Sequence, residues 1–419
     1  MQKDLIVNNK KGDKKVLAKN TIALMIIQVL NYVIPFITLP YVSRIFEVDK
    51  FGVIFFAQSM VDYLGRFIMF GFSLSAVRMI AINRDDKNKI NSIVNSVLCG
   101  QVLLIIVCFI LLAIIIYFIP KFRADAVIYY YSFLGVVASA FLMTWFYQGM
   151  EKMKFITFLN VITRAISLIL IFTVIKKAED YWLYPLLNSS ALVVTAIISS
   201  IFARKCFGLK FKIESFKNIW DSLVYSSEFF LSQIAITLDR QTNVFVLGVV
   251  CASTTVAYYC AADKIFMAVF VLYTTFVNAL FPYMSKNKDI VFYKKMLKYL
   301  IIFIIGLTIV MMFLAKPIIL LFYSSKYIAS VPILHIFMCV FVFNALVSVL
   351  GYSLLGAFGY TRETNTCYVL GGIYNAVGLF ILYIAHSINI YTIAILASSV
   401  YIVMFIHRIY YIRKYKLLS

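Results

Sequence analysis

Long uncharged segments limit this chain to one class of protein. No Asp, Glu, Lys or Arg occurs between Glu363 and Arg408, and a membrane-spanning helix needs about 20 predominantly apolar residues. This segment is therefore long enough for two helices, and we divide it at residues 386–389. Twelve apolar runs of spanning length can be marked, at approximately 17–43, 51–76, 91–119, 126–149, 154–175, 181–203, 220–249, 253–282, 297–315, 328–356, 364–385 and 390–411.

These runs predict an all-α polytopic membrane protein of about twelve helices, because a helix pairs all of its backbone polar groups within the bilayer. Composition agrees, since 63% of residues are apolar and 14% charged. Soluble domains carry roughly 45–50% apolar and about 25% charged residues. We take the first helix to be retained, because its apolar run is too long for a signal-peptide core.

The basic residues give an orientation, since short cytoplasmic loops are enriched in Lys and Arg. Connections on one side, together with both tails, carry 27 of these residues, whereas the opposite side carries eight: Arg44, Lys50, Lys121, Arg123, Lys176, Lys177, Lys316 and Lys326. Both termini are therefore predicted to be cytoplasmic. The net charge of +21 points to a membrane surface and not to nucleic acid, because the basic residues lie between the apolar runs.

A weak internal repeat predicts two halves. Residues 51–58 match residues 256–263 at an offset of 205, and both segments open a span. We expect an N-terminal six-helix lobe at 1–203, a basic cytoplasmic linker at 204–218 and a C-terminal six-helix lobe at 219–419. Both halves begin on the same side, so the repeat is parallel. Transporters with two such bundles bind substrate between them and expose it to the two sides in turn.

Enzyme functions find little support in the sequence. No GxxxxGKS phosphate-binding loop is present, and the seven Cys show neither a CxxC pair nor a spacing suited to zinc. His335, His386 and His407 lie far apart and are interpreted as structural. We therefore expect no catalytic residue, metal or cofactor.

Charged residues inside the expected spans are the candidate functional residues, because they are costly in lipid and normally face a bundle interior or a wet cavity. They are Asp62, Arg66, Arg164, Glu228, Asp239, Arg240, Asp263 and Lys264.

Four of these charges lie in the seventh and eighth spans. Asp239 and Lys264 are equally distant from the tip of the hairpin between these spans, and so are Arg240 and Asp263. Cross-helix ion pairs would offset the desolvation of all four groups. Two interpretations stay open, a structural clamp and a charge relay that rearranges during transport.

Arg66 and Arg164 are predicted to bind a diphosphate. Counted from their cytoplasmic helix ends, both lie roughly 15–18 Å deep at 1.5 Å per residue. Two guanidinium groups at one depth suit a phosphate group. The alternative is that Arg66 pairs with Asp62, four residues earlier on the same helix.

Several short motifs resemble those of a known family. The first hairpin carries Arg44-Ile45-Phe46, Phe51-Gly52-Val53 and Ala57-Gln58-Ser59; further matches are residues 148–154, residues 238–240 and residues 258–264. Together they resemble the Wzx-type flippases for O-antigen and capsular polysaccharide repeat units, which belong to the multidrug/oligosaccharidyl-lipid/polysaccharide (MOP) exporter superfamily. The sequence departs from the family at Ala257, where Gly is usual.

The resemblance implies a substrate and a location. The substrate would be an undecaprenyl-diphosphate-linked oligosaccharide, moved across the bacterial cytoplasmic membrane for O-antigen, lipopolysaccharide or capsule biosynthesis. Membrane lipids and a polysaccharide polymerase are the implied partners. Two alternatives stay open: a multidrug exporter of the same superfamily, which would favour buried acids, and a membrane glycan polymerase, which would need a larger external domain.

Overall fold

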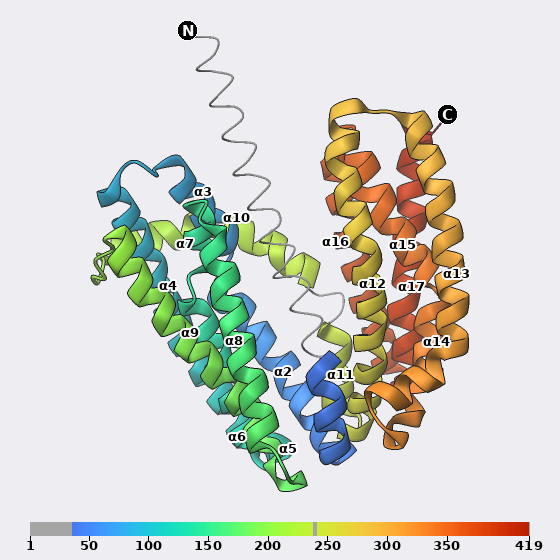
Figure 1. Ribbon diagram of the computed structural model, residues 1–419, viewed down its shortest axis with the longest axis horizontal. Helices are drawn as coiled ribbons and strands as arrows, with labels where there is room; N and C mark the ends of the chain where they lie inside the picture. Colours follow the sequence, from blue (N-terminus) through green and yellow to red (C-terminus); the bar gives the residue numbers. More distant parts are fainter. Residues whose placement is uncertain (1–35, 238–240, 419) are drawn as a thin grey trace. The chain divides into compact units, whose positions relative to one another are not determined.

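The computed structural model describes residues 36–237 and 241–418 (Figure 1). Within these ranges it describes all side chains except those at 231–237, 272, 274–276, 278–279 and 282. All regular secondary structure in the described ranges is helical. The chain divides into two compact units. Unit 1 contains the residues up to Phe46 and Met60–Gln233, and unit 2 contains Glu47–Ser59 and the residues from Ile234 onward. The lobe boundaries expected from the repeat stay a prediction.

Unit 1 is a bundle of long helices joined by short turns. Its elements are helical residues 36–45, the end of α2 (Val48–Met69), α3 (Phe72–Ile82), α4 (Lys87–Phe118), α5 (Pro120–Arg123), α6 (Ala126–Phe141), α7 (Thr144–Gly149), α8 (Met153–Val174), the short η1 (Ala178–Trp182), α9 (Leu183–Phe207) and most of α10 (Phe216–Thr237).

Unit 2 begins with the first turns of α2. Its other elements are α11 (Gln241–Val250), α12 (Ser253–Asn287), α13 (Ile290–Phe322), η2 (Ser325–Ser330), α14 (Val331–Cys339), α15 (Phe341–Leu350), the π-helical η3 (Gly351–Gly356), α16 (Thr361–Ile384) and α17 (Ile390–Lys414).

Ten of the twelve expected spans correspond to helical segments of the described chain. Nine are apolar helical segments of spanning length, and the tenth is the bent pair 325–339 and 341–356, with 42° between its helices. The expected first span, 17–43, lies largely outside the described residues. The expected seventh span, 220–249, coincides with α10 and α11 on either side of residues 238–240, which also lie outside them. The count of twelve therefore stays a prediction.

The expected second span is a helix pair and not one continuous helix. α2 ends at Met69 and α3 begins at Phe72, and the intervening Phe70 and Gly71 have positive φ angles of 39° and 75°. A Cβ on Gly71 would lie 2.7 Å from the Phe230 nitrogen of α10, so glycine is required here. The depth estimated for Arg66 assumed one unbroken helix from Arg66 to Arg78. That assumption is wrong, because the chain leaves helical geometry at Phe70 and Gly71.

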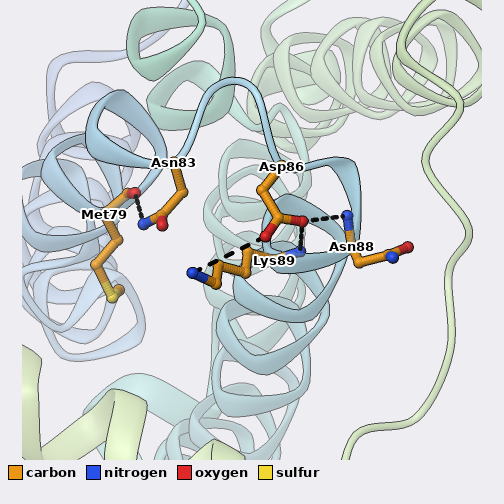
Figure 2. A network of polar contacts seen from close by, with 5 residues as sticks. All are labelled: Met79, Asn83, Asp86, Asn88 and Lys89. Atoms are coloured by element: carbon orange, nitrogen blue, oxygen red, sulfur yellow. Dashed lines mark hydrogen bonds and ion pairs between the residues drawn. The ribbon is translucent and has the colours of Figure 1, made fainter.

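A polar loop orders the start of α4 on the side predicted to be cytoplasmic. Figure 2 shows Asp86 capping this helix: its Oδ1 accepts hydrogen bonds of 3.0 Å from the backbone nitrogens of Asn88 and Lys89. Asn83 donates from Nδ2 to the Met79 carbonyl oxygen at 2.8 Å and closes the end of α3. Each cap satisfies backbone groups that have no partner inside a helix.

Aromatic residues form the core of unit 1 next to this loop. Trp145, Phe146 and Tyr147 of α7 are 0–1% exposed, and the Tyr147 hydroxyl donates to the Ser199 carbonyl oxygen of α9 at 2.6 Å. Arg84 ties the adjoining loops together, because it pairs with Glu151 at 2.8 Å and donates to the Gly149 carbonyl oxygen at 2.7 Å.

Glycines set the packing of α2 within unit 2. A Cβ on Gly52 would overlap the Ser253 carbonyl oxygen at the start of α12, and a Cβ on Gly248 of α11 would overlap the ring of Phe56. Helices cross this closely in membranes only where small residues let the backbones meet. The first turns of α2 are therefore an integral part of unit 2.

Candidate substrate site and intramembrane charges

Arg164 lies in a polar seam between α8 and α9. Its side chain is half-buried and lies near Tyr184 of α9, whose ring is packed edge-on to Phe46 at 6.4 Å between ring centroids. One helical turn farther along α8, the Ser167 hydroxyl donates to Asn188 Oδ1 at 2.6 Å. Arg164 thus lies inside a span, one helical turn from a hydroxyl–amide contact between α8 and α9.

One further hydrogen bond joins the two helices: the Thr163 hydroxyl donates to the Thr195 hydroxyl at 2.5 Å. Within α9, Asn188 Nδ2 donates to the Tyr184 carbonyl oxygen at 2.8 Å. Hydroxyl and amide side chains join helices in membranes in this way. The sequence had singled out Arg164; the polar contacts between α8 and α9 come only from the structure, because they depend on how the two helices pack.

Arg66 occupies the last turn of α2, also in unit 1, and its side chain is exposed. Asp62, one turn earlier, is half-buried. An exposed guanidinium within a span is far more stable next to water than next to lipid tails. Arg66 thus fits a water-accessible surface of unit 1. A diphosphate shared by Arg66 and Arg164 stays a prediction.

Asp263 borders a small cavity in unit 2. The cavity has a volume of about 20 Å³, enough for one water molecule, and Asp263 itself is half-buried. The lining residues come from α11, α12, α17 and the bent pair α14 and α15: Asn243, Tyr259, Asp263, Phe266, Phe337, Val340, Ala397, Ser398 and Tyr401. Polar residues of α11, α12 and α17 therefore line the cavity beside the carboxylate.

Lys264, the next residue, is exposed, and its ammonium lies 5.9 Å from the centroid of the Phe55 ring of α2. Such a cation–π contact is worth about 0.5–1 kcal/mol at an exposed site. Asp239 and Arg240, the partners expected for Lys264 and Asp263, lie outside the described residues. Both cross-helix ion pairs therefore stay predictions.

Arg408 is a buried cation that the sequence analysis missed. Its side chain is 0% exposed in α17, and its guanidinium carbon lies 5.3 Å from the centroid of the Tyr368 ring of α16. A Cβ on Gly351 would overlap Nη1 of this arginine, so the π-helical turn leaves room for it. None of its three nitrogens has a hydrogen-bond partner among the described residues.

Arg408 lies within the expected last span, 390–411, but was counted with the cytoplasmic basic residues and not with the intramembrane charges. Its helix continues to Lys414, and the exposed Arg413 and Lys414 mark the real end of the apolar segment. Its position three residues inside the expected span was the signal that could have placed it among the intramembrane charges.

Comparison with known proteins places the chain among polysaccharide biosynthesis proteins. The family model described as "Polysaccharide biosynthesis protein" matches residues 17–288. A protein named "Putative O-antigen transporter" from Escherichia coli (strain K12) is 26% identical over 375 residues, which are 88% of this chain and 90% of that protein. A protein of the same name from Shigella dysenteriae is 28% identical over 399 residues, 92% of this chain and 98% of that protein.

Solved structures share the fold at low sequence identity. The lipid II flippase MurJ in an inward closed conformation aligns with a TM-score of 0.70 and 16% identity, covering 94% of this chain and 87% of that one. An inward-facing multidrug resistance MATE family transporter of the MOP superfamily aligns with a TM-score of 0.63 and 14% identity, covering 89% and 94%. The helices thus follow the fold of that superfamily, as the motifs had indicated.

Proposed function

Because this chain belongs to the polysaccharide biosynthesis protein family and is a membrane transporter with a MurJ- and MATE-like fold, we propose that it flips lipid-linked oligosaccharides. The substrate is an undecaprenyl-diphosphate-linked repeat unit, which enters from the cytoplasmic leaflet of the bacterial cytoplasmic membrane and leaves in the outer leaflet. A site open first to one side and then to the other carries it across. The product feeds O-antigen or capsule assembly, with a polysaccharide polymerase as the partner that consumes it.

The observation that carries the proposal is the placement of cations in unit 1. Arg164 is held half-buried in a polar seam, and Arg66 is exposed within a span. A diphosphate carries its negative charge on oxygens that accept bidentate hydrogen bonds from guanidinium groups. We assign these two arginines to the diphosphate, and Asp62, Asp263 and Lys264 to the charge network around the transport path.

A multidrug exporter is the second candidate, favoured by the fold that this chain shares with MATE transporters. A cationic drug would require a dominant acid in its site, whereas the intramembrane charges of unit 1 include Arg66 and Arg164 against Asp62 and the exposed Glu228. These four charges sum to zero, so no acid dominates unit 1 and a cationic drug would meet no excess of negative charge there.

Complementation separates these functions. The chain is expressed in a bacterium that lacks its own repeat-unit flippase, and surface glycan is measured by labelling intact cells. We expect surface glycan to return, with no change in resistance to cationic drugs. Drug resistance without surface glycan would favour the exporter. Restored glycan in a strain lacking its polymerase instead of its flippase would favour the polymerase.

A further inference from the structure

A groove on unit 1 lies where α9 turns into α10, and neither Arg66 nor Arg164 lines it. Residues 208–215 connect these helices without regular structure and run along α4. Asn91 and Asn95 of α4 hold this connection: Asn91 Oδ1 accepts from the Lys210 nitrogen at 2.8 Å, and Asn95 Nδ2 donates to the Lys210 carbonyl oxygen at 2.9 Å. Asn95 Oδ1 also accepts from the Lys212 nitrogen at 3.2 Å. These hydrogen bonds fix the connection against α4.

The groove has a cavity volume of about 750 Å³. This volume falls within the roughly 300–1,000 Å³ typical of small-molecule sites. Apolar side chains of α4, the connection and α10 dominate the lining, and Lys212 and Glu214 are its two charged members. A ligand that fits must therefore be mostly hydrocarbon, with a charged group at one end.

Apolar side chains around the groove also face outward. Ile213 is 94% exposed, Phe216 72% and Trp220 57%, and the rings of Phe216 and Trp220 stack with centroids 6.4 Å apart. Exposed aromatic residues one helical turn apart are typical of a helix that lies in a membrane interface. Lipid chains are therefore the medium in contact with this groove.

The charges near the groove favour a ligand with an anionic headgroup. Between residues 204 and 221 the chain carries Arg204, Lys205, Lys210, Lys212 and Lys217 against Glu214 and Asp221. All five basic side chains are exposed. Basic segments at a membrane surface attract anionic lipids.

We propose that this groove is a binding site for an anionic phospholipid. One acyl chain occupies the cavity beside Val102 and Leu103 of α4, and the headgroup phosphate pairs with Lys212 at its edge. The lipid lies against the connection that Asn91 and Asn95 hold to α4. The two arginines assigned to the transported substrate are not part of this lining, and occupancy of the groove does not depend on the proposed transport function.

Cys99 makes the proposal testable, because this half-buried thiol lines the groove, while the exposed Cys206 lies outside the lining. In the full-length protein with Cys251→Ser and Cys339→Ser, both thiols are labelled with a maleimide in detergent and quantified by mass spectrometry. Phosphatidylglycerol or phosphatidylcholine is titrated in. We expect phosphatidylglycerol to slow labelling of Cys99 at least fivefold while Cys206 reacts unchanged, and phosphatidylcholine to need about five times the mole fraction.

Two variants with matched controls test the two halves of the site. Lys212→Gln should raise the phosphatidylglycerol fraction needed for half-protection about fivefold, which corresponds to roughly 1 kcal/mol for one basic residue at the surface. Lys295 is an exposed lysine at the start of α13, and Lys295→Gln should leave the phosphatidylglycerol fraction needed for half-protection unchanged. Val102→Trp should fill the groove and abolish lipid dependence, whereas Ile106→Trp, one turn farther along α4 and outside the lining, should not.

Three outcomes would overturn the proposal. Equal protection by both phospholipids would remove the headgroup selectivity. Protection by undecaprenyl phosphate but not by phosphatidylglycerol would assign the groove to the carrier lipid. Disulfide-linked dimers through Cys99 in place of lipid protection would assign it to a second copy of the chain.

Discussion

At the residue scale, arginines inside the spans show what sequence could and could not establish. Arg164 was found because it stands alone among apolar residues of one helix, and the structure adds the polar seam in which it lies. Arg408 was missed because its burial depends on Tyr368 and Gly351 in two other helices. A single sequence gives the position of a charge along a helix, but its surroundings depend on tertiary packing.

Arg164 substitutions separate a phosphate ligand from a structural cation. A phosphate ligand depends on charge and on the planar two-donor fork of arginine, whereas a structural side chain depends on size and pairing. We expect Arg164→Lys to keep part of the transport and Arg164→Gln to lose most of it. One charge-assisted contact is worth roughly 1.5–3 kcal/mol, or about a ten- to hundredfold weakening.

The measurement for this series is surface glycan normalised to the amount of protein in the membrane. Arg164→Glu should abolish transport altogether. If Arg164→Gln reached normal abundance and supported wild-type glycan, the side chain would be an ordinary structural cation and the diphosphate assignment would be lost.

Arg408 gives a prediction about stability: replacing this buried charge should not destabilise the protein. A buried charge is often replaced by an apolar residue of similar volume at no cost, or with a gain of about 1–4 kcal/mol. We expect Arg408→Met to melt at the same or a higher temperature in detergent. Gly351→Ala should lower the melting temperature, because overpacking costs about 1–3 kcal/mol.

The double variant Gly351→Ala with Arg408→Met serves as the control, since removing the guanidinium relieves the overlap. The double variant should regain most of the melting temperature that Gly351→Ala alone loses. Strictly additive effects of the two substitutions would show that the arginine and the glycine do not meet.

At the element scale, the apolar runs located the helices well, and the breaks within them were harder to find. The pair α2 and α3 reads in the sequence as one uninterrupted span, yet positive φ angles at Phe70 and Gly71 divide it. The bend between α14 and α15 at Val340 has no Gly or Pro to mark it. Such breaks arise from helix crossings, which one sequence does not reveal.

The crossing of α2 and α12 depends on Gly52. A methyl group there would overlap the Ser253 carbonyl oxygen, so Gly52→Ala should push the helices apart and lower the melting temperature by several degrees. Gly306→Ala is the matched control in α13, where a Cβ meets nothing within 4 Å. This change should be neutral or stabilising, because alanine favours a helix by about 1 kcal/mol over glycine. A tolerated Gly52→Ala would mean that the helices cross at a greater distance.

At the scale of the whole molecule, the all-helical fold followed from apolar run lengths, and its superfamily followed from short ordered motifs. The division of the chain is less regular than a simple repeat suggests, because the first turns of α2 belong to unit 2 and most of α10 belongs to unit 1. These exchanges at the boundary come from packing between elements far apart in sequence, for which the repeat offset carries no information.

The orientation of the whole chain is tested by reporter fusions. The excess of basic residues on one side predicts that fusions at Asn9, Lys210 and the C-terminus report the cytoplasm, and that fusions at Ala124, Ala252 and Ser387 report the outside. A reversal of the pattern beyond any one of these positions would reveal a miscounted span at that point.

The central claim is that this protein moves an undecaprenyl-diphosphate-linked oligosaccharide between leaflets, and its most direct test is a leaflet assay. Purified full-length protein is reconstituted into vesicles with a fluorescent form of this lipid, and the fraction accessible to a membrane-impermeant quencher is followed with time. We predict that the accessible fraction rises from about half toward completeness with wild-type protein, and slowly or not at all with Arg164→Gln. Identical time courses in protein-containing and protein-free vesicles would contradict the account.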